Sequence, residues 1–117
     1  MGAKTFRDLI VWQKAHDLVL KIYKATRNFP DEEKFGLVSQ MRRSALSIPS
    51  NIVEGFRRKG RDKLNFYYYS LGSLEELQYQ IFLSLDLNYI TEENYNNINY
   101  NCDEVSKILH KWINLAK

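Results

Sequence analysis

Apolar residues recur at spacings of three and four residues over most of the chain, which is the pattern of amphipathic helices. Four such stretches fall at about residues 8–28, 31–59, 62–87 and 91–115. No stretch sustains the alternation of apolar and polar residues that is typical of a strand. Four helices of similar length joined by short turns predict an all-α fold, in which residues 1–117 form one up-down-up-down antiparallel four-helix bundle domain.

The expected core side chains share one face of each predicted helix, because residues three and four apart lie one above another on a helix. The only cysteine lies on such a face and acts there as a small hydrophobe, and a single cysteine excludes an intrachain disulfide or a multi-cysteine metal site. The predicted core consists of Val11, Ala15, Leu18, Ile22, Ala25, Phe29, Leu37, Met41, Ala45, Ile48, Ile52, Phe56, Phe66, Tyr67, Leu71, Leu74, Leu77, Ile81, Leu85, Tyr95, Ile98, Cys102, Val105, Leu109, Trp112 and Ile113.

Proline, glycine and capping residues set the expected ends of the helices. Phe29 precedes a proline and should end the first helix, because that position is disfavoured in helical geometry. Pro49 should bend the second helix without ending it, since the apolar pattern continues in phase beyond it. Gly60 is expected to stop the second helix and Thr91 to cap the fourth.

Three of the predicted helices carry a second apolar stripe beside the core-facing one. One interpretation is a wide core with aromatic residues at its rim, and the other is an interface between subunits, where Tyr, Trp and Arg are enriched. Gly72, which has no side chain, would allow another surface to approach closely. The interface candidates are Trp12, Val19, Tyr23, Leu46, Pro49, Val53, Tyr68, Gly72, Tyr79 and Leu83.

Charge is unevenly distributed along the chain. The net charge is +3, but residues 1–63 hold 14 basic and seven acidic side chains, whereas residues 64–117 hold three basic and seven acidic ones. Such asymmetry either marks a surface that faces a polyanion or is neutralised between helices or subunits. No apolar run is long enough for a signal peptide or a transmembrane helix, so we expect a cytoplasmic protein with no membrane partner.

The residue pattern does not support enzyme chemistry. His16 and His110 have no cysteine or carboxylate at metal-ligand spacing, and neither a glycine-rich phosphate loop nor a nucleophile–base arrangement is present. We therefore expect a protein that is not an enzyme, with no catalytic residue, no metal and no cofactor.

Five basic side chains within seven residues mark the junction of the second and third helices. Such a cluster either contacts phosphates with salt-sensitive affinity or is a solvated turn that stabilises the C-terminal end of a helix. The cluster consists of Arg57, Arg58, Lys59, Arg61 and Lys63.

Polar side chains also line up along one face of the second helix. Arg43, Ser47, Ser50 and Glu54 share this face, whereas Arg42 borders the second apolar stripe. The line is open to three interpretations, namely an intramolecular ion-pair network, a polar lock between subunits, or a binding strip.

Several segments, in their order and separations, resemble a known family. They are residues 8–15 (DLIVWQKA), 29–30 (FP), 35–37 (FGL), 40–58 (QMRRSALSIPSNIVEGFRR) and 72–77 (GSLEEL), of which the fourth is the most specific. The chain resembles the four-helix-bundle proteins that are encoded in intervening sequences of bacterial 23S rRNA genes. The resemblance covers most of residues 8–90, and the last helix matches only in length and helical character.

This resemblance implies a bundle that assembles into a ring-like homopentamer. A related branch, the accessory variability determinant proteins of diversity-generating retroelements, binds reverse transcriptase and nucleic acid through a basic surface. We accordingly predict a non-enzymatic homo-oligomer that binds RNA, DNA or a reverse-transcriptase-like protein. The alternative is a protein-only scaffold, whose basic residues serve subunit contacts or solubility. The candidate nucleic-acid contacts are Arg42, Arg43, Arg57, Arg58, Lys59, Arg61 and Lys63.

Overall fold

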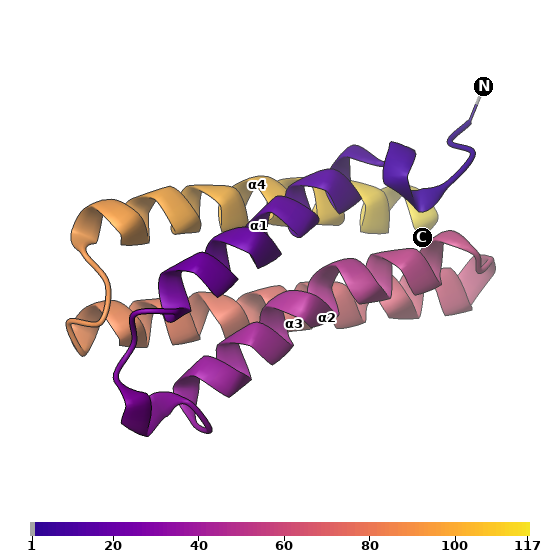
Figure 1. The fold of residues 1–117 in the computed structure, drawn as a ribbon. Helices are drawn as coiled ribbons and strands as arrows, with labels where there is room; N and C mark the ends of the chain where they lie inside the picture. The colour runs from indigo at the N-terminus through magenta and orange to yellow at the C-terminus, as the bar shows by residue number, and fades with distance from the viewer. Residues whose placement is uncertain (1) are drawn as a thin grey trace.

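Four long helices make up most of the protein. The computed structural model describes residues 2–117 and holds α1 (Ile10–Thr26), α2 (Leu37–Phe56), α3 (Gly60–Asp86) and α4 (Glu92–Ala116). Two short 3-10 helices, η1 (Phe6–Asp8) and η2 (Asp31–Glu33), precede α1 and α2. Successive long helices run in opposite directions (Figure 1), and no strand occurs in the described part of the chain. The predicted all-α antiparallel four-helix bundle is thereby confirmed.

The four helices are arranged as a square in cross-section. α2 packs on α3, α3 on α4, and α1 on both α2 and α4, so that α1 and α3 lie on a diagonal. The bundle is elongated, with principal extents of 45 × 25 × 22 Å. Both termini lie at the same end as the α2–α3 turn, and the α1–α2 and α3–α4 connections lie at the other end (Figure 1). We call these two ends the turn end and the loop end.

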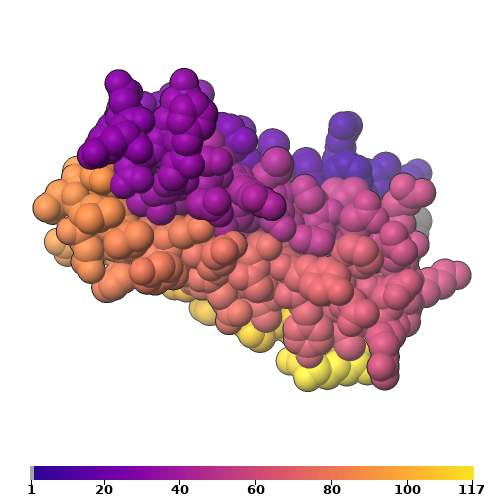
Figure 2. Space-filling view, turned by 90° about the horizontal axis from the view of Figure 1, so that it is seen from below, coloured from indigo at the N-terminus to yellow at the C-terminus, as the bar shows by residue number. Residues whose placement is uncertain are grey.

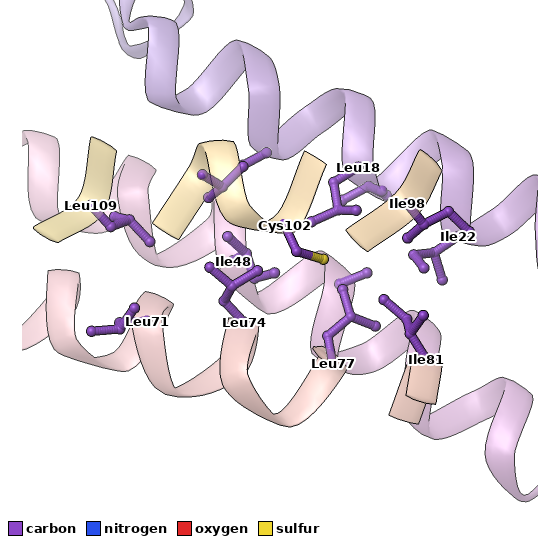
Figure 3. Packing of buried hydrophobic residues seen from close by; sticks show 14 of the residues in the cluster. Leu18, Ile22, Ile48, Leu71, Leu74, Leu77, Ile81, Ile98, Cys102 and Leu109 are labelled. Carbon is purple, nitrogen blue, oxygen red and sulfur yellow. The ribbon is translucent and has the colours of Figure 1, made fainter. Parts of the chain in front are cut away.

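The core is continuous along the bundle and receives side chains from all four helices. Leu18 of α1, Ile48 of α2 and Leu74 of α3 are fully buried and converge on the thiol of Cys102 from α4 (Figure 3). Most of the predicted core residues are buried, and nearly all of the others pack against the buried cluster with part of their surface exposed. The predicted helical periodicity therefore identified the core faces correctly.

Several side chains depart from the predicted core, and Leu9 and Ile90 are buried although the predicted core did not include them. Phe66 is half-exposed and lies beneath the guanidinium of Arg58 instead of joining the buried cluster. Val19, expected on an interface stripe, and Val38 are buried in the core. The core therefore extends further toward the α1–α2 contact than the predicted stripes indicate.

α1 ends at Thr26, two residues before the predicted end at residue 28. Arg42 of α2 explains the early end, because its Nε donates to Thr26 Oγ1 (2.9 Å) and its Nη2 donates to the carbonyl of Tyr23 (3.3 Å). The Thr26 hydroxyl in turn donates to the Ile22 carbonyl at 2.7 Å. The Arg42 side chain thus supplies a donor to the Tyr23 carbonyl in the last turn of the helix, where carbonyls lack helical donors.

α2 begins at Leu37, so the prediction of a helix from residue 31 is wrong. Asp31–Glu33 forms a 3-10 turn, and Gly36 occupies the N-cap position with φ −110° and ψ −110°. The carboxylate of Glu33 accepts hydrogen bonds from the Leu37 N–H (3.3 Å) and from the hydroxyl of Tyr89 (2.8 Å). Glu33 therefore caps α2 from outside and ties it to the α3–α4 connection.

α2 remains one helix through Pro49, as predicted. Proline lacks an N–H and leaves the carbonyl of Ala45 without its helical donor. The carbonyls of the next three residues each accept a side-chain hydrogen bond of 2.8 Å. These bonds run from Ser50 to Leu46, from Asn51 to Ser47 and from Ser70 to Ile48. The last of them comes from α3, so the proline turn is held by the neighbouring helix.

The prediction that Gly60 stops the second helix is also wrong. α2 ends at Phe56, and Gly60 opens α3 with a φ of +60°, in the left-handed region that favours glycine. Thr91 caps α4 as predicted, with its hydroxyl accepting the Asn94 N–H at 3.1 Å.

Candidate functional site

The α2–α3 turn presents three basic side chains to solvent without a charged partner. Arg57, Lys59 and Arg61 are exposed, and within residues 2–117 none of them forms a salt bridge. Lys63 follows on α3, half-buried beside Tyr67 and close to the C-terminal end of α4. We call Arg57, Lys59, Arg61 and Lys63 the basic turn.

Arg58 belongs to the same run of sequence but has a different environment. Its guanidinium lies 3.3 Å from the Glu54 carboxylate and 3.8 Å from that of Asp62, and it stacks 4.9 Å from the centre of the Phe66 ring. Its charge is therefore largely compensated within the chain, which separates it from its neighbours in the predicted cluster.

The fold also collects positive charge at the turn end of the bundle. Three segments meet there, namely residues 2–9, 54–63 and 110–117. Together they hold nine basic and three acidic side chains. Residues 24–36 and 83–96, at the loop end, hold three basic and six acidic ones. Figure 2 shows the end of α4 beside the α2–α3 turn, at the far end of the molecule from the projecting α1–α2 connection. The charge asymmetry of the sequence thus becomes a polarity along the long axis.

Arg42 and Arg43 lie away from the basic turn, toward the loop end of α2. Arg42 is half-buried and holds the end of α1, with its guanidinium 4.6 Å from the centre of the Tyr23 ring. Arg43 is exposed and lines a groove of about 470 Å³ between α1 and α2, together with Phe35 and Leu46. The structure therefore divides the seven predicted contacts into two separate groups.

The polar line on α2 does not form one network. Ser47 faces α3, where its hydroxyl accepts a 2.8 Å hydrogen bond from Ser73, while Ser50 donates to its own helix. Glu54 pairs with Arg58, and Arg43 has no hydrogen-bond or ion-pair partner within the described residues. Among the described residues, Ser47 is the one member of this line that hydrogen-bonds to α3.

The predicted interface residues fall on two different faces. Those on α1 and α2 flank the contact between these helices, where Leu46 is 51% exposed but Val19 and Pro49 are buried. Those on α3 lie on its outer side, where Tyr79 is 63% exposed. As interface candidates, Val19 and Pro49 are wrong, because the core already covers them. The remaining candidates, exposed or half-exposed, are Trp12, Tyr23, Val53, Tyr68, Gly72 and Leu83.

Other exposed apolar side chains were missed by the sequence analysis. Phe35 is 90% exposed at the mouth of the α1–α2 groove, and Phe82 extends the outer face of α3 toward Tyr95 of α4, with ring centres 6.5 Å apart. The family-like FGL segment contained Phe35, but the sequence analysis placed this residue inside a helix from residue 31 and off its core stripe, whereas in the structure it precedes α2.

Nucleophilic and metal chemistry have little support in the geometry. Cys102 is fully buried, and burial, together with the nearby Asp103 carboxylate, raises the pKa of its thiol to about 12. The thiol is therefore protonated and inaccessible near neutral pH. His16 stacks on Trp12, and His110 bonds within its own helix to Ser106. In residues 2–117 no three histidine, cysteine or acidic side chains gather as a possible metal site.

None of the helices in the described residues combines the length and apolar character needed to cross a membrane.

Comparisons with known proteins confirm the resemblance seen in the sequence segments. The chain matches the model of the 23S rRNA-intervening sequence protein family over residues 7–111. No curated protein matches it. It is similar to the solved structure of a protein of unknown function from the S23 ribosomal protein family of Bacteroides thetaiotaomicron, with 30% identity, a TM-score of 0.80 and coverage of 89% of this chain and 98% of that chain. Because the family match spans the four helices almost entirely, the chain belongs to the 23S rRNA-intervening sequence protein family.

Proposed function

We propose that this protein is a non-enzymatic, self-associating helical bundle that binds nucleic acid, or a protein that processes nucleic acid, through the basic turn. The observation that carries the proposal is the set of three exposed basic side chains that form no salt bridge within residues 2–117, at the end where both termini add further positive charge. Counter-ions that condense on nucleic-acid phosphates are released when such side chains bind, which favours association without regard to sequence.

The position of Lys63 strengthens this assignment. Lys63 borders a shallow hollow with Tyr67, Trp112 and Leu115, so that a basic side chain lies directly beside exposed and half-exposed apolar surface. Nucleic-acid binding surfaces combine backbone-neutralising charge with surfaces on which bases can rest. The remaining members of the basic turn have no salt-bridge partner in the described part of the chain, so their charges are available to a phosphate backbone.

Self-association is supported by the two apolar faces. The α1–α2 groove is lined by Phe35 and Leu46, whereas the outer face of α3 carries Tyr79 and Phe82, so the two faces differ in their residues. Two unlike faces favour heterologous contacts, which generate a ring when the rotation closes. The proposal therefore includes a homo-oligomer, and we take the ring-like homopentamer implied by the family resemblance as its form.

A binding measurement tests the nucleic-acid part of the proposal. Fluorescence anisotropy with labelled single-stranded RNA and double-stranded DNA would compare the wild type with the Arg57→Ala/Lys59→Ala/Arg61→Ala variant. We expect weaker binding and a salt-dependence slope reduced by about 2–3, since each neutralised phosphate contributes about 0.7–0.9. The matched control is Arg27→Ala/Lys34→Ala/Lys107→Ala, which removes the same charge elsewhere. Equal binding by all three proteins would remove the basic turn as the site.

The second candidate function is a protein-only scaffold. It is favoured by the intramolecular use of Arg42 and Arg58 and by the exposed aromatic side chains on α3. It predicts no binding to RNA or DNA at physiological salt, whereas the assembled state persists. Light scattering that gives a 13.9 kDa monomer at micromolar concentration would contradict both functions, because each contains self-association.

A further inference from the structure

A polar cavity lies at the loop end, far from the basic turn. It has a volume of about 360 Å³ and lies between the end of α1, the α3–α4 connection and the start of α4, at the far end of the bundle from both termini (Figure 1). Apolar side chains of Ala25, Ile90 and Ile98 provide part of its wall. Its polar lining consists of Lys21, Lys24, Asn28, Tyr89, Thr91, Asn94 and Asn97.

Lys21 has an environment that is unusual for a half-buried ammonium group. Its Nζ donates to the side-chain carbonyl oxygens of Asn97, at 2.9 Å, and of Asn101. Both partners are neutral, and the nearest carboxylate of this network, that of Glu104, is paired with Lys14 at 3.1 Å. A partly buried charge is stabilised best by an opposite charge, so Lys21 lacks the partner that its position calls for.

Further donors around the cavity are unused. The ammonium group of Lys24 and the side-chain amides of Asn28 and Asn94 form no side-chain hydrogen bond within residues 2–117. No carboxylate lines the cavity, since Glu92 and Glu93 of the first turn of α4 are exposed outside it. Two lysines and two asparagines with unused amides thus line a cavity whose lining, within residues 2–117, includes no carboxylate.

We propose that this cavity binds a small phosphate monoester. Its phosphate would lie between Lys21 and Lys24 and accept hydrogen bonds from the amides of Asn28 and Asn94, while its organic part would rest on Ile90 and Ile98. Lysine binds phosphate as a point charge, whereas planar carboxylates are matched by the fork of arginine, which is absent from the lining. The volume lies at the small end of the range of ligand pockets, about 300–1,000 Å³.

This inference is independent of the proposed function. The basic turn and the cavity lie at opposite ends of the bundle and share no residue. Loss of nucleic-acid binding in the basic-turn variant would leave the cavity intact, and failure of the cavity to bind phosphate would leave the basic turn unaffected.

The test is an NMR titration of the ¹⁵N-labelled full chain with phenyl phosphate, inorganic phosphate and benzoate. We expect phenyl phosphate to bind most tightly, with amide shifts concentrated in residues 21–28 and 89–98. Lys21→Gln should weaken its binding by about tenfold and Lys24→Gln by about threefold, because each removes one charge-assisted contact. The control Lys107→Gln, an exposed lysine of α4 outside the cavity, should leave the affinity unchanged.

Three results would overturn the proposal. Benzoate binding as tightly as phenyl phosphate would contradict the choice of phosphate. Shifts confined to residues 57–63 would place the anion on the basic turn. Equal affinities of the wild type, Lys21→Gln and Lys24→Gln would show that neither lysine contacts the ligand, provided that circular dichroism shows all three to be folded.

Discussion

Arg42 and Arg57 lie on and just after the same helix and carry the same charge, yet their surroundings differ completely. Arg42 is half-buried, bonds to Tyr23 and Thr26 of α1 and stacks on an aromatic ring. Arg57 is exposed and has no ion-pair partner among the described residues. The comparison teaches that a count of basic residues overstates the charge available for a ligand, because some of it is already used to hold the fold.

The largest expected effect is the loss of stability on replacing Arg42, the half-buried member of this pair. Arg42→Ala should lower the free energy of unfolding by about 2–3 kcal/mol, since hydrogen bonds from a charged donor contribute more than neutral ones and their loss leaves the end of α1 without a cap. Urea unfolding followed by circular dichroism measures the change. Arg43→Ala is the matched control, with an expected change of about 0.5 kcal/mol or less. Equal losses in the two variants would contradict the capping role of Arg42.

A similar contrast exists between two glycines. A Cβ at Gly55 would lie 2.8 Å from Cε1 of Tyr67 and 3.3 Å from Cβ of Phe66, where α2 meets α3. Tyr67 is buried and packs against Trp112, with ring centres 5.5 Å apart, so it has little room to move. Gly55→Ala should therefore cost about 2 kcal/mol of stability, as overpacking does in a dense core. A melting temperature equal to that of the wild type would show that the junction is looser than this packing implies.

Gly72 differs from Gly55, which faces the ring of Tyr67. A Cβ placed at Gly72 would meet no described atom within 4 Å beyond its own stretch of helix backbone. Gly72→Ala should stabilise the monomer fold by about 0.5–1 kcal/mol through the higher helix propensity of alanine. If the outer face of α3 is an interface, the same change should also weaken assembly in sedimentation experiments. Unchanged assembly would remove Gly72 from the proposed interface and sharpen its boundary.

The smallest effects concern the basic turn itself. Arg58→Ala should cost about 0.5 kcal/mol at low salt, because its ion pairs are exposed and screened, and less at 1 M salt. Arg57→Ala should change stability by less than Arg58→Ala at either salt concentration, since it removes no partner. A larger stability loss in Arg57→Ala would indicate that Arg57 is structural and would weaken its assignment as a free phosphate contact.

The prediction from sequence succeeded where local periodicity decides the outcome. The positions that pack around Cys102, such as Leu18 and Leu74, follow the helical repeat and were identified from it. The prediction failed at the end of α1 and the beginning of α2, where contacts between distant residues contribute, whereas Thr91 caps α4 as predicted. Arg42 ends α1, and Glu33 with Tyr89 sets the beginning of α2. Arg42 lies 16 positions from Thr26 and Tyr89 lies 56 positions from Glu33, so no local pattern could show these contacts.

The candidate site was predictable in the same limited way. The basic run was visible, as was the four-residue spacing of Arg58 from Glu54 and Asp62 with which it pairs, but not that Val19 is covered by the core. Spacing alone shows that a residue borders a core stripe, whereas exposure depends on how close the neighbouring helix packs. The cavity around Lys21 and Lys24 joins α1 to α4 and is visible only in the folded chain.

The sequence by itself determined the all-α class, the four helices, most of the core and the presence of a basic run. These follow from the 3.6-residue helical repeat and from composition, which are properties of short segments. Only the tertiary structure decided that both termini meet the α2–α3 turn at one end, so that charge is polarised along the bundle. It also decided which basic side chains remain free, because the antiparallel packing of the helices brings charges from distant segments together.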